Sequence, residues 1–298
     1  MKVFSERMDK PHAYLFGEYT NPLGFDPIEL TLSEDGQDWQ SIFDNSNLSN
    51  VYLIDFDWLP PVIADTYRTA GTRDGQQLAS SRLGQRDLVL KFIAYCYDDA
   101  DEKLTFQSLS NFLIRRHNYW VAFDNGGGRM YHVREKTITA EYYDDKMMMV
   151  TATLNNFTGV AQSIMPSTHI NEMPNIGLGS PNDTVNYLFS TSEFDVNNIG
   201  ELPVDPLVQS DYLDITLTGI GSPTIANTTT GDAITCMRPL KTGDTFKLIG
   251  VNPQINGQAA GINTDNGIIR LANGNNHFKI TGCQDLNCAV SFYFKYLN

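Results

Sequence analysis

The chain has 298 residues, with 21 lysine and arginine residues against 35 aspartate and glutamate residues, so its formal net charge is −14 at pH 7. This acidic balance argues against nucleic acid as a partner, because phosphate binding needs a basic surface. The length is sufficient for two domains that each bury a core. Charge is interspersed through the first residues and no apolar stretch could span a bilayer, so we expect neither a signal peptide nor membrane insertion.

Two early strands are predicted at residues 51–58 and 87–95, where apolar and polar side chains alternate, and the second places Leu88, Leu90, Phe92 and Ala94 on one face. The segment between them begins with two prolines and contains the turn-forming pair Asp74–Gly75. It predicts an extended hairpin with polar, partly basic arms that carry Arg68, Arg73, Arg82 and Arg86. A compact domain has little reason to project such an arm unless the arm contacts something. We therefore place a candidate interface on this segment, at Arg68, Arg73, Asp74, Gly75 and Arg82.

The clearest helix is predicted over residues 100–118. Asp99 is a plausible N-cap with Glu102 three residues later, as in a capping box. An apolar stripe at helical spacing predicts packing against a sheet rather than ligand binding; it consists of Phe106, Leu109, Phe112 and Leu113.

The next elements are a hairpin that turns at residues 124–128 and a strand at residues 146–156. The strand places Met148, Val150, Ala152 and Leu154 on its buried face and closes the first domain. We set the first domain at residues 1–158.

Residues 159–210 are rich in glycine, proline and asparagine and predict a linker or long surface connection. The last third reads as one short alternating strand after another. These segments are DYLDITLTG (211–219), TFKLIG (245–250), GIIRLANG (267–274), HFKITG (277–282) and AVSFYFKYL (289–297). Their spacing predicts a β-sandwich or jelly roll in a second domain at residues 159–298.

No motif in the chain carries a catalytic, cofactor-binding or metal-binding set. The glycines at 126–128 lead into a strand rather than the helix that a phosphate loop needs, and the five histidines lack metal-ligand spacing. We expect no enzyme activity and no cofactor. The four cysteines, of which Cys283 and Cys288 could bridge a hairpin in an oxidising compartment, are expected to be free thiols; they are Cys96, Cys236, Cys283 and Cys288.

Carbohydrate binding by the second domain remains open. Such domains often stack sugars on exposed aromatic rings, and the candidates here are Tyr293 and Tyr212.

Taken in order, the motifs resemble the distal tail protein (Dit) family of siphophages. In the first domain the resemblance rests on the arm with GTRDG (71–75), the strand at 87–95, the helix and GGGRMYHV (126–133). In the second it rests on FDVNNIGELPVDPLV (194–208), LDITLTG (213–219), NTTTGDAI (227–234), LKTGDTFKL (240–248) and LANGNNHFKITG (271–282).

The resemblance implies a mainly β fold with one clear helix. Its N-terminal part is a small β-barrel-like ring domain with hairpin and helix, and its C-terminal part is a galectin-like β-sandwich. It also implies a structural hub at the virion tail tip, assembled in the host cytoplasm as a homo-hexamer. The implied partners are the tail tube protein, the tail-associated (tail fibre or lysin) protein, and receptor-binding proteins or a cell-wall saccharide. A different reading is a host-adhesion module that binds carbohydrate through the C-terminal sandwich.

Overall fold

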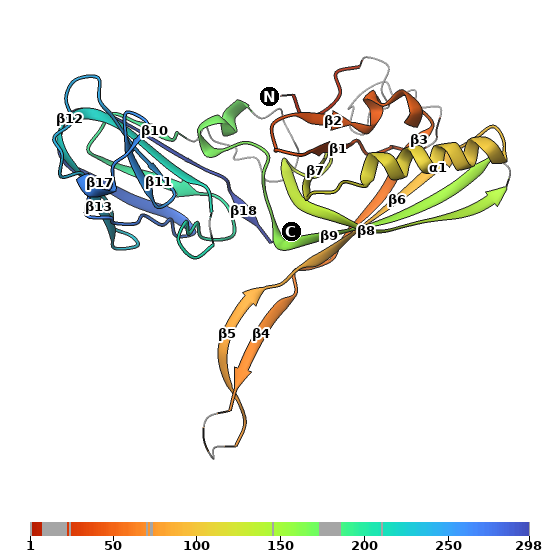
Figure 1. Ribbon diagram of the computed structural model, residues 1–298, viewed down its shortest axis with the longest axis horizontal. Coiled ribbons are helices and arrows are strands. Elements are labelled where there is room, and N and C mark those ends of the chain that lie inside the picture. The colour runs from red at the N-terminus through yellow and green to blue at the C-terminus, as the bar shows by residue number, and fades with distance from the viewer. Residues whose placement is uncertain are drawn as a thin grey trace. The chain divides into compact units, whose positions relative to one another are not determined.

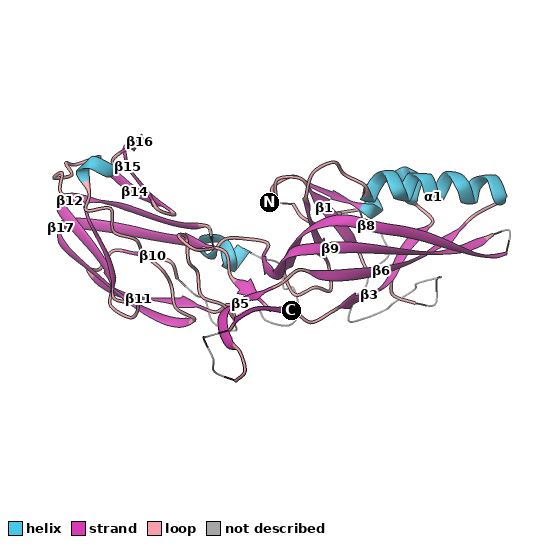
Figure 2. Cartoon of the chain, turned by 60° about the horizontal axis from the view of Figure 1, so that its bottom comes forward, coloured by secondary structure: helices cyan, strands magenta, loops and turns pink. Residues whose placement is uncertain are grey.

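The computed structural model describes residues 2–7, 23, 25–69, 71, 74–144, 146–172, 186–209 and 211–297. The chain divides into two compact units. The first holds the described residues up to 161 together with Leu297, and the second holds those from 162 to 296. Antiparallel strands build both units, and α1 (Asp99–Leu113) is the one α-helix of the described residues (Figures 1 and 2). The predicted mainly β fold with one clear helix is confirmed.

The first unit is a sheet with the strand order β2-β1-β7-β8-β9-β6-β3. Its strands are β1 (Leu30–Ser33), β2 (Trp39–Ser41), β3 (Val51–Trp58), β6 (Arg86–Tyr95), β7 (Tyr119–Phe123), β8 (Arg129–Asp144) and β9 (Met147–Ser163). Two short 3-10 helices follow β2, η1 (Ile42–Asp44) and η2 (Ser46–Leu48). The order leaves β2 and β3 at the ends, so the sheet is not a closed barrel, and an isolated bridge between Ile28 and Leu53 brings the chain just before β1 against β3.

The centre of this sheet is the pair β6 and β9. Its register sets Leu88 opposite Leu154 and Phe92 opposite Val150, so the predicted buried faces of the two strands coincide. All of these side chains lie in the core. Alternation with a period of two had predicted both faces, and the structure confirms them.

Helix α1 begins and ends earlier than the sequence suggested. Asp98, not Asp99, is the N-cap, because its backbone is extended and its carboxylate accepts hydrogen bonds from the amides of Ala100 and Asp101. The helix ends at Leu113 because Ile114 is extended. The Arg115 guanidinium then donates to the carbonyl of Asn111 over 2.7 Å. Of the predicted apolar stripe, Phe106 is half-buried, whereas the core takes Leu109, Phe112 and Leu113.

The second unit is built on two long strands, β12 (Leu213–Asn227) and β17 (Gly274–Phe292). β10 (Leu188–Phe189) and β11 (Glu193–Asn198) pair with β17, while β13 (Asp232–Thr235) and β14 (Thr245–Ile249) pair with β12. Beyond β14 the sheet continues through β15 (Asn252–Ile255) and β16 (Gln258–Ala259). The remaining elements are η3 (Ser167–Glu172), η4 (Gly261–Asn263) and β18 (Lys295–Tyr296).

Several short strands predicted in the last third are parts of longer ones. Residues 277–282 and the first part of 289–297 lie in the single strand β17, because Gly282 does not end a strand but bends it at a positive φ of 72°. Its partner β12 shifts register on both sides of Gly221. Residues 267–274 form no regular strand before Gly274, and Leu271 makes an isolated bridge to Val204. Apolar side chains from both halves of the β12–β17 pair join one core cluster.

Within the described ranges, no helix is long and apolar enough to cross a membrane. The four cysteines are free thiols.

His132 on β8 should make the stability of the first unit depend on pH. Its ring stacks on Trp120 at 4.2 Å and lies 4.6 Å from the ring of Phe157, and burial lowers its pKa below the ordinary 6.5. As pH falls below about 6.5, the unfolded chain takes up this proton before the folded chain does, so stability is lost. We expect the melting temperature of the wild type to fall more steeply between about pH 7 and pH 5 than that of His132→Phe. Parallel curves would contradict this role for His132.

Candidate functional site

The predicted arm is a two-stranded hairpin that projects from the first unit (Figures 1 and 2). It consists of β4 (Ile63–Arg68) and β5 (Gln77–Leu83), which pair with each other in a sheet of their own. The hairpin predicted between the strands at 51–58 and 87–95 is thereby confirmed. A two-stranded ribbon alone is marginally stable in water, so a surface that covers it would add to its stability.

The arm has an apolar face exposed to solvent. A bulge between Thr66 and Tyr67 sets the register Ile63↔Leu83 and Tyr67↔Leu78, which places these four side chains on one face. Ile63 is 64% exposed, Tyr67 53% and Leu78 56%. Burial of one such side chain contributes about 1.5–3 kcal/mol. Exposed apolar side chains that share one face of a projecting hairpin make this face a candidate interaction surface, although the Asp65–Ser81 pair separates its two apolar pairs.

The interface residues proposed from the sequence lie elsewhere on the arm. Arg68 and Arg82 are exposed on the opposite face, opposite Gln77 and Ala64 in the register. Four residue steps along the ribbon separate them, roughly 13 Å. Asp74 and Gly75 are exposed in the turn, and Arg73 lies outside the described residues.

Sequence reasoning stressed charge and missed the apolar face. The period of two in Ile63 and Tyr67 was a usable signal, but Asp65 interrupts it. In the structure the Tyr67 hydroxyl donates to the Asp65 carboxylate over 3.0 Å, which accommodates the acid on that face.

Arg86, which the sequence placed on the polar arm, is instead a buried residue of β6 at the base of the arm. Arg86 is 2% exposed, and its Nη1 donates to the carbonyls of Leu59 and Leu297 over 3.3 and 2.6 Å. Its guanidinium lies 5.6 Å from the ring centroid of Tyr131. Burial lowers the pKa of Arg86, but an arginine in a protein stays charged. This cation therefore ties the start of the arm to the core of the unit.

The strand β9 supplies the other half of the base. The side chain of the buried Asn156 donates to the carbonyl of Val160 and accepts from the amides of Thr158 and Gly159, which fixes an irregular turn of β9. Gly159, at φ 73°, brings its backbone against Gly84, whose amide donates to Val62 across the arm. A Cβ at position 159 would collide with the carbonyl oxygen of Gly84. Only glycine permits this approach.

In the second unit, the two tyrosines named as sugar-binding candidates lie together. The rings of Tyr212 and Tyr293 are 5.3 Å apart, and Tyr212 is 45% exposed. The Tyr212 hydroxyl lies 3.5 Å from Asp214, which pairs with Lys247 over 2.7 Å. Aromatic rings beside a carboxylate and an ammonium group can bind a polar ligand with a flat apolar face.

Because Gly159 lies so close to Gly84, a methyl group added at position 159 should destabilise the first unit more than one added at another glycine with positive φ. Gly159→Ala and Gly75→Ala both introduce a side chain at positive φ, at a cost of about 1–2 kcal/mol each. A Cβ at Gly75 has open space around it, whereas one at Gly159 meets Gly84. We expect Gly159→Ala to lower the free energy of unfolding by a further 1–3 kcal/mol or so, measured by denaturant titration. Equal losses in the two variants would show that the approach does not constrain the base.

No protein-family model matches the chain, and neither does any curated protein. Among solved structures, the crystal structure of the SPP1 Dit protein, described as a paradigm of hub adsorption apparatus in Gram-positive infecting phages, matches with a TM-score of 0.61. The match covers 89% of this chain and 99% of that one at 17% identity. The phage P2 baseplate in its activated conformation with Ca matches at a TM-score of 0.41 and 8% identity, covering 89% and 98%, a likeness too weak to add to the fold assignment. The chain has the fold of the SPP1 Dit protein.

Proposed function

We propose that the chain is a structural hub protein of a phage tail tip, a member of the Dit family. In this role it forms a homo-hexameric ring that joins the tail tube protein to the tail-associated protein. Residues 1–158 form the ring domain, and residues 159–298 form the outer β-sandwich domain, which anchors receptor-binding proteins. The chain acts in the virion after assembly in the host cytoplasm, and it performs no catalysis.

The observation that carries the proposal is the match to a phage hub protein along both units. The match covers 99% of the SPP1 Dit chain. A match to one unit alone would have been weak support, because β-sandwich architecture recurs in proteins of unrelated function. A single match that spans both β units of this chain is a more specific likeness.

The arm supports the ring on physical grounds. A cyclic ring needs a heterologous contact, in which one surface of a subunit meets a different surface of the next. The exposed apolar face of Ile63, Tyr67 and Leu78 supplies one such surface. Its distance from the body of the first unit leaves it free to reach a neighbouring subunit (Figure 1).

Charge on the apolar face of the arm should weaken the ring. The test variant combines Ile63→Asp with Leu78→Asp, and the matched control combines Thr66→Asp with Gln77→Asp on the opposite face. Both add the same charge at exposed positions that are not opposite one another in the register. In analytical ultracentrifugation we expect the test variant to sediment as species smaller than the wild-type ring. The reason is that two apolar side chains buried at each contact between subunits contribute about 3–6 kcal/mol. The control variant should sediment with the mass of the wild-type ring.

Two results of this experiment would count against the proposal. A wild type that stays monomeric at every concentration would exclude the ring. A ring that both variants form equally well would exclude the apolar face as its contact. Deletion of residues 68–82 or replacement of Arg73 and Asp74 extends the test to the turn of the arm.

A second candidate function is carbohydrate binding through the second unit, which the Tyr212–Tyr293 pair favours. If the pair stacks on a sugar ring, Tyr212→Ala should weaken binding of host cell-wall polysaccharide by about tenfold or more. The exposed Tyr143 of the first unit provides the control, since Tyr143→Ala removes a similar ring elsewhere. No polysaccharide binding by the wild type in glycan pull-down assays would exclude this function.

A further inference from the structure

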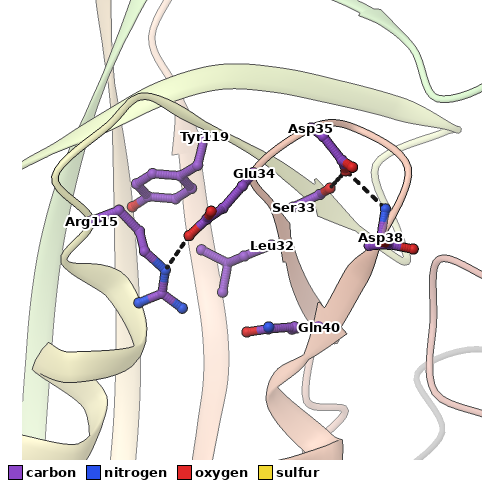
Figure 3. Close-up of a pocket in the computed structure, with 8 residues that line it drawn as sticks. All are labelled: Leu32, Ser33, Glu34, Asp35, Asp38, Gln40, Arg115 and Tyr119. Carbon is purple, nitrogen blue, oxygen red and sulfur yellow. Dashed lines mark hydrogen bonds and ion pairs between the residues drawn. The ribbon is translucent and has the colours of Figure 1, made fainter.

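A ring held together by the arm needs a second surface on each copy, which receives the arm of the neighbouring copy. This surface must be exposed and apolar, because the arm offers an exposed apolar face. The pocket at the turn between β1 and β2 does not fit this requirement (Figure 3). Its lining includes Glu34, Asp35, Asp38 and Arg115, and an apolar face laid over charged groups would remove them from water at a cost in free energy.

The second unit carries four exposed apolar side chains on neighbouring turns, and this set is termed the turn patch. Its members and their exposed fractions are Leu207 (58%), Val208 (71%), Tyr212 (45%) and Val251 (38%). The first three precede β12, and the fourth lies between β14 and β15. The two segments are tied together, since the amide of Gly250 donates to the carbonyl of Leu213 over 2.7 Å. The second unit therefore has an apolar surface where two of its turns meet.

Hydrogen bonds hold the first of these turns in one shape. The carboxylate of Asp205 accepts from the amides of Leu207 and Val208, each over 2.9 Å. The amide of Asp205 in turn donates to the carboxylate of Asp211 over 3.0 Å. Asp211 forms an ion pair with Lys295 over 2.8 Å, and both of these side chains are mostly buried. A turn fixed in this way loses little conformational entropy when a partner covers its apolar side chains.

The charges of the arm and of the turn patch have opposite signs. Residues 63–83 contain three arginines and two aspartates, a formal charge of +1 in a chain that carries −14. The ionised side chains that support the turn patch are three acids and two lysines, which leaves −1; they are Asp205, Asp211, Asp214, Lys247 and Lys295. Copies of this chain repel one another on average, so a contact between a basic and an acidic surface is favoured over other contacts between copies.

We propose that the apolar face of the arm of one copy docks on the turn patch of the next copy. The inference rests on the proposed ring, in which each copy provides one arm and receives another. Ile63, Tyr67 and Leu78 then lose their exposure to water against Leu207 and Val208. The two surfaces differ, so copies add head to tail until the ring closes.

Sedimentation of the full chain tests this contact. The patch variant combines Leu207→Ser with Val208→Ser, which removes apolar area without adding charge. We expect it to sediment as monomers at concentrations where the wild-type ring is intact, because association between copies is weakened about a hundredfold or more. Its melting temperature should stay close to that of the wild type, since both side chains are exposed.

The control variant combines Met237→Ser with Ile262→Ser in the same unit. Both side chains are exposed, and the amide of Met237 donates to the carbonyl of Asn263 over 2.8 Å, so they also lie on neighbouring turns. Arg238, which follows Met237, has the same charge sign as the arm, so this pair is not expected to receive the arm. The control variant should sediment with the mass of the wild-type ring.

A mixture of two variants tests whether the arm and the turn patch meet each other. The arm variant, Ile63→Asp with Leu78→Asp, keeps an intact turn patch, and the patch variant keeps an intact arm. Each variant alone should be monomeric. An equimolar mixture should form a species with twice the mass of one chain, because each such pair can make one productive contact and no more.

Three results would overturn the proposed contact. They are a patch variant with the mass of the wild-type ring, a control variant that dissociates as far as the patch variant, and a mixture that stays monomeric. A patch variant that keeps the ring but loses binding of cell-wall polysaccharide would assign the turn patch to a sugar instead. Each of these results leaves the ring itself in place when the wild type assembles, whereas a monomeric wild type would exclude both the ring and the contact.

Discussion

The close approach of two backbones at the base of the arm constrains the first unit. Gly159 of β9 lies against Gly84, and the buried Asn156 holds β9 in the irregular path that this approach needs. The buried Arg86 completes the base from the other side by donating to the carbonyls of Leu59 and Leu297. The hairpin therefore leaves the sheet from a rigid base, although its own strands pack mainly on each other. A base fixed in this way limits the orientations that the hairpin can take relative to the sheet.

The second unit uses glycine in a related way. At Gly221 and Gly282 a Cβ would collide with the carbonyl oxygen of the facing strand, so the backbones of β12 and β17 approach more closely than side chains would permit. The pair can then bend and continue where it would otherwise end. Because both halves of the pair contribute to one core, a single long ribbon organises the unit.

Net charge and exposed apolar area act in opposite directions between two copies of this chain. Copies that each carry −14 repel one another, although salt limits this repulsion to within about 8 Å under physiological conditions. An apolar face such as that of Tyr67 and Leu78 contributes attraction between like-charged copies, since burial of apolar area does not depend on charge.

The local sequence pattern determined those features of the fold that depend only on residues close together in the chain. Alternation along residues 87–95 determined which side of β6 is buried, and Asp74–Gly75 between two extended segments determined the hairpin. The tertiary structure alone decided the rest, because those features join residues that are distant in the chain. Gly282 reads as a strand end until its approach to Ser222 is known, and Tyr119 reads as an ordinary core residue until its hydroxyl is found to have no hydrogen-bond partner among the described residues. Sequence determined periodicity and turns; close backbone approach and unsatisfied polar groups arise only once the chain has folded, since both depend on which distant atoms meet.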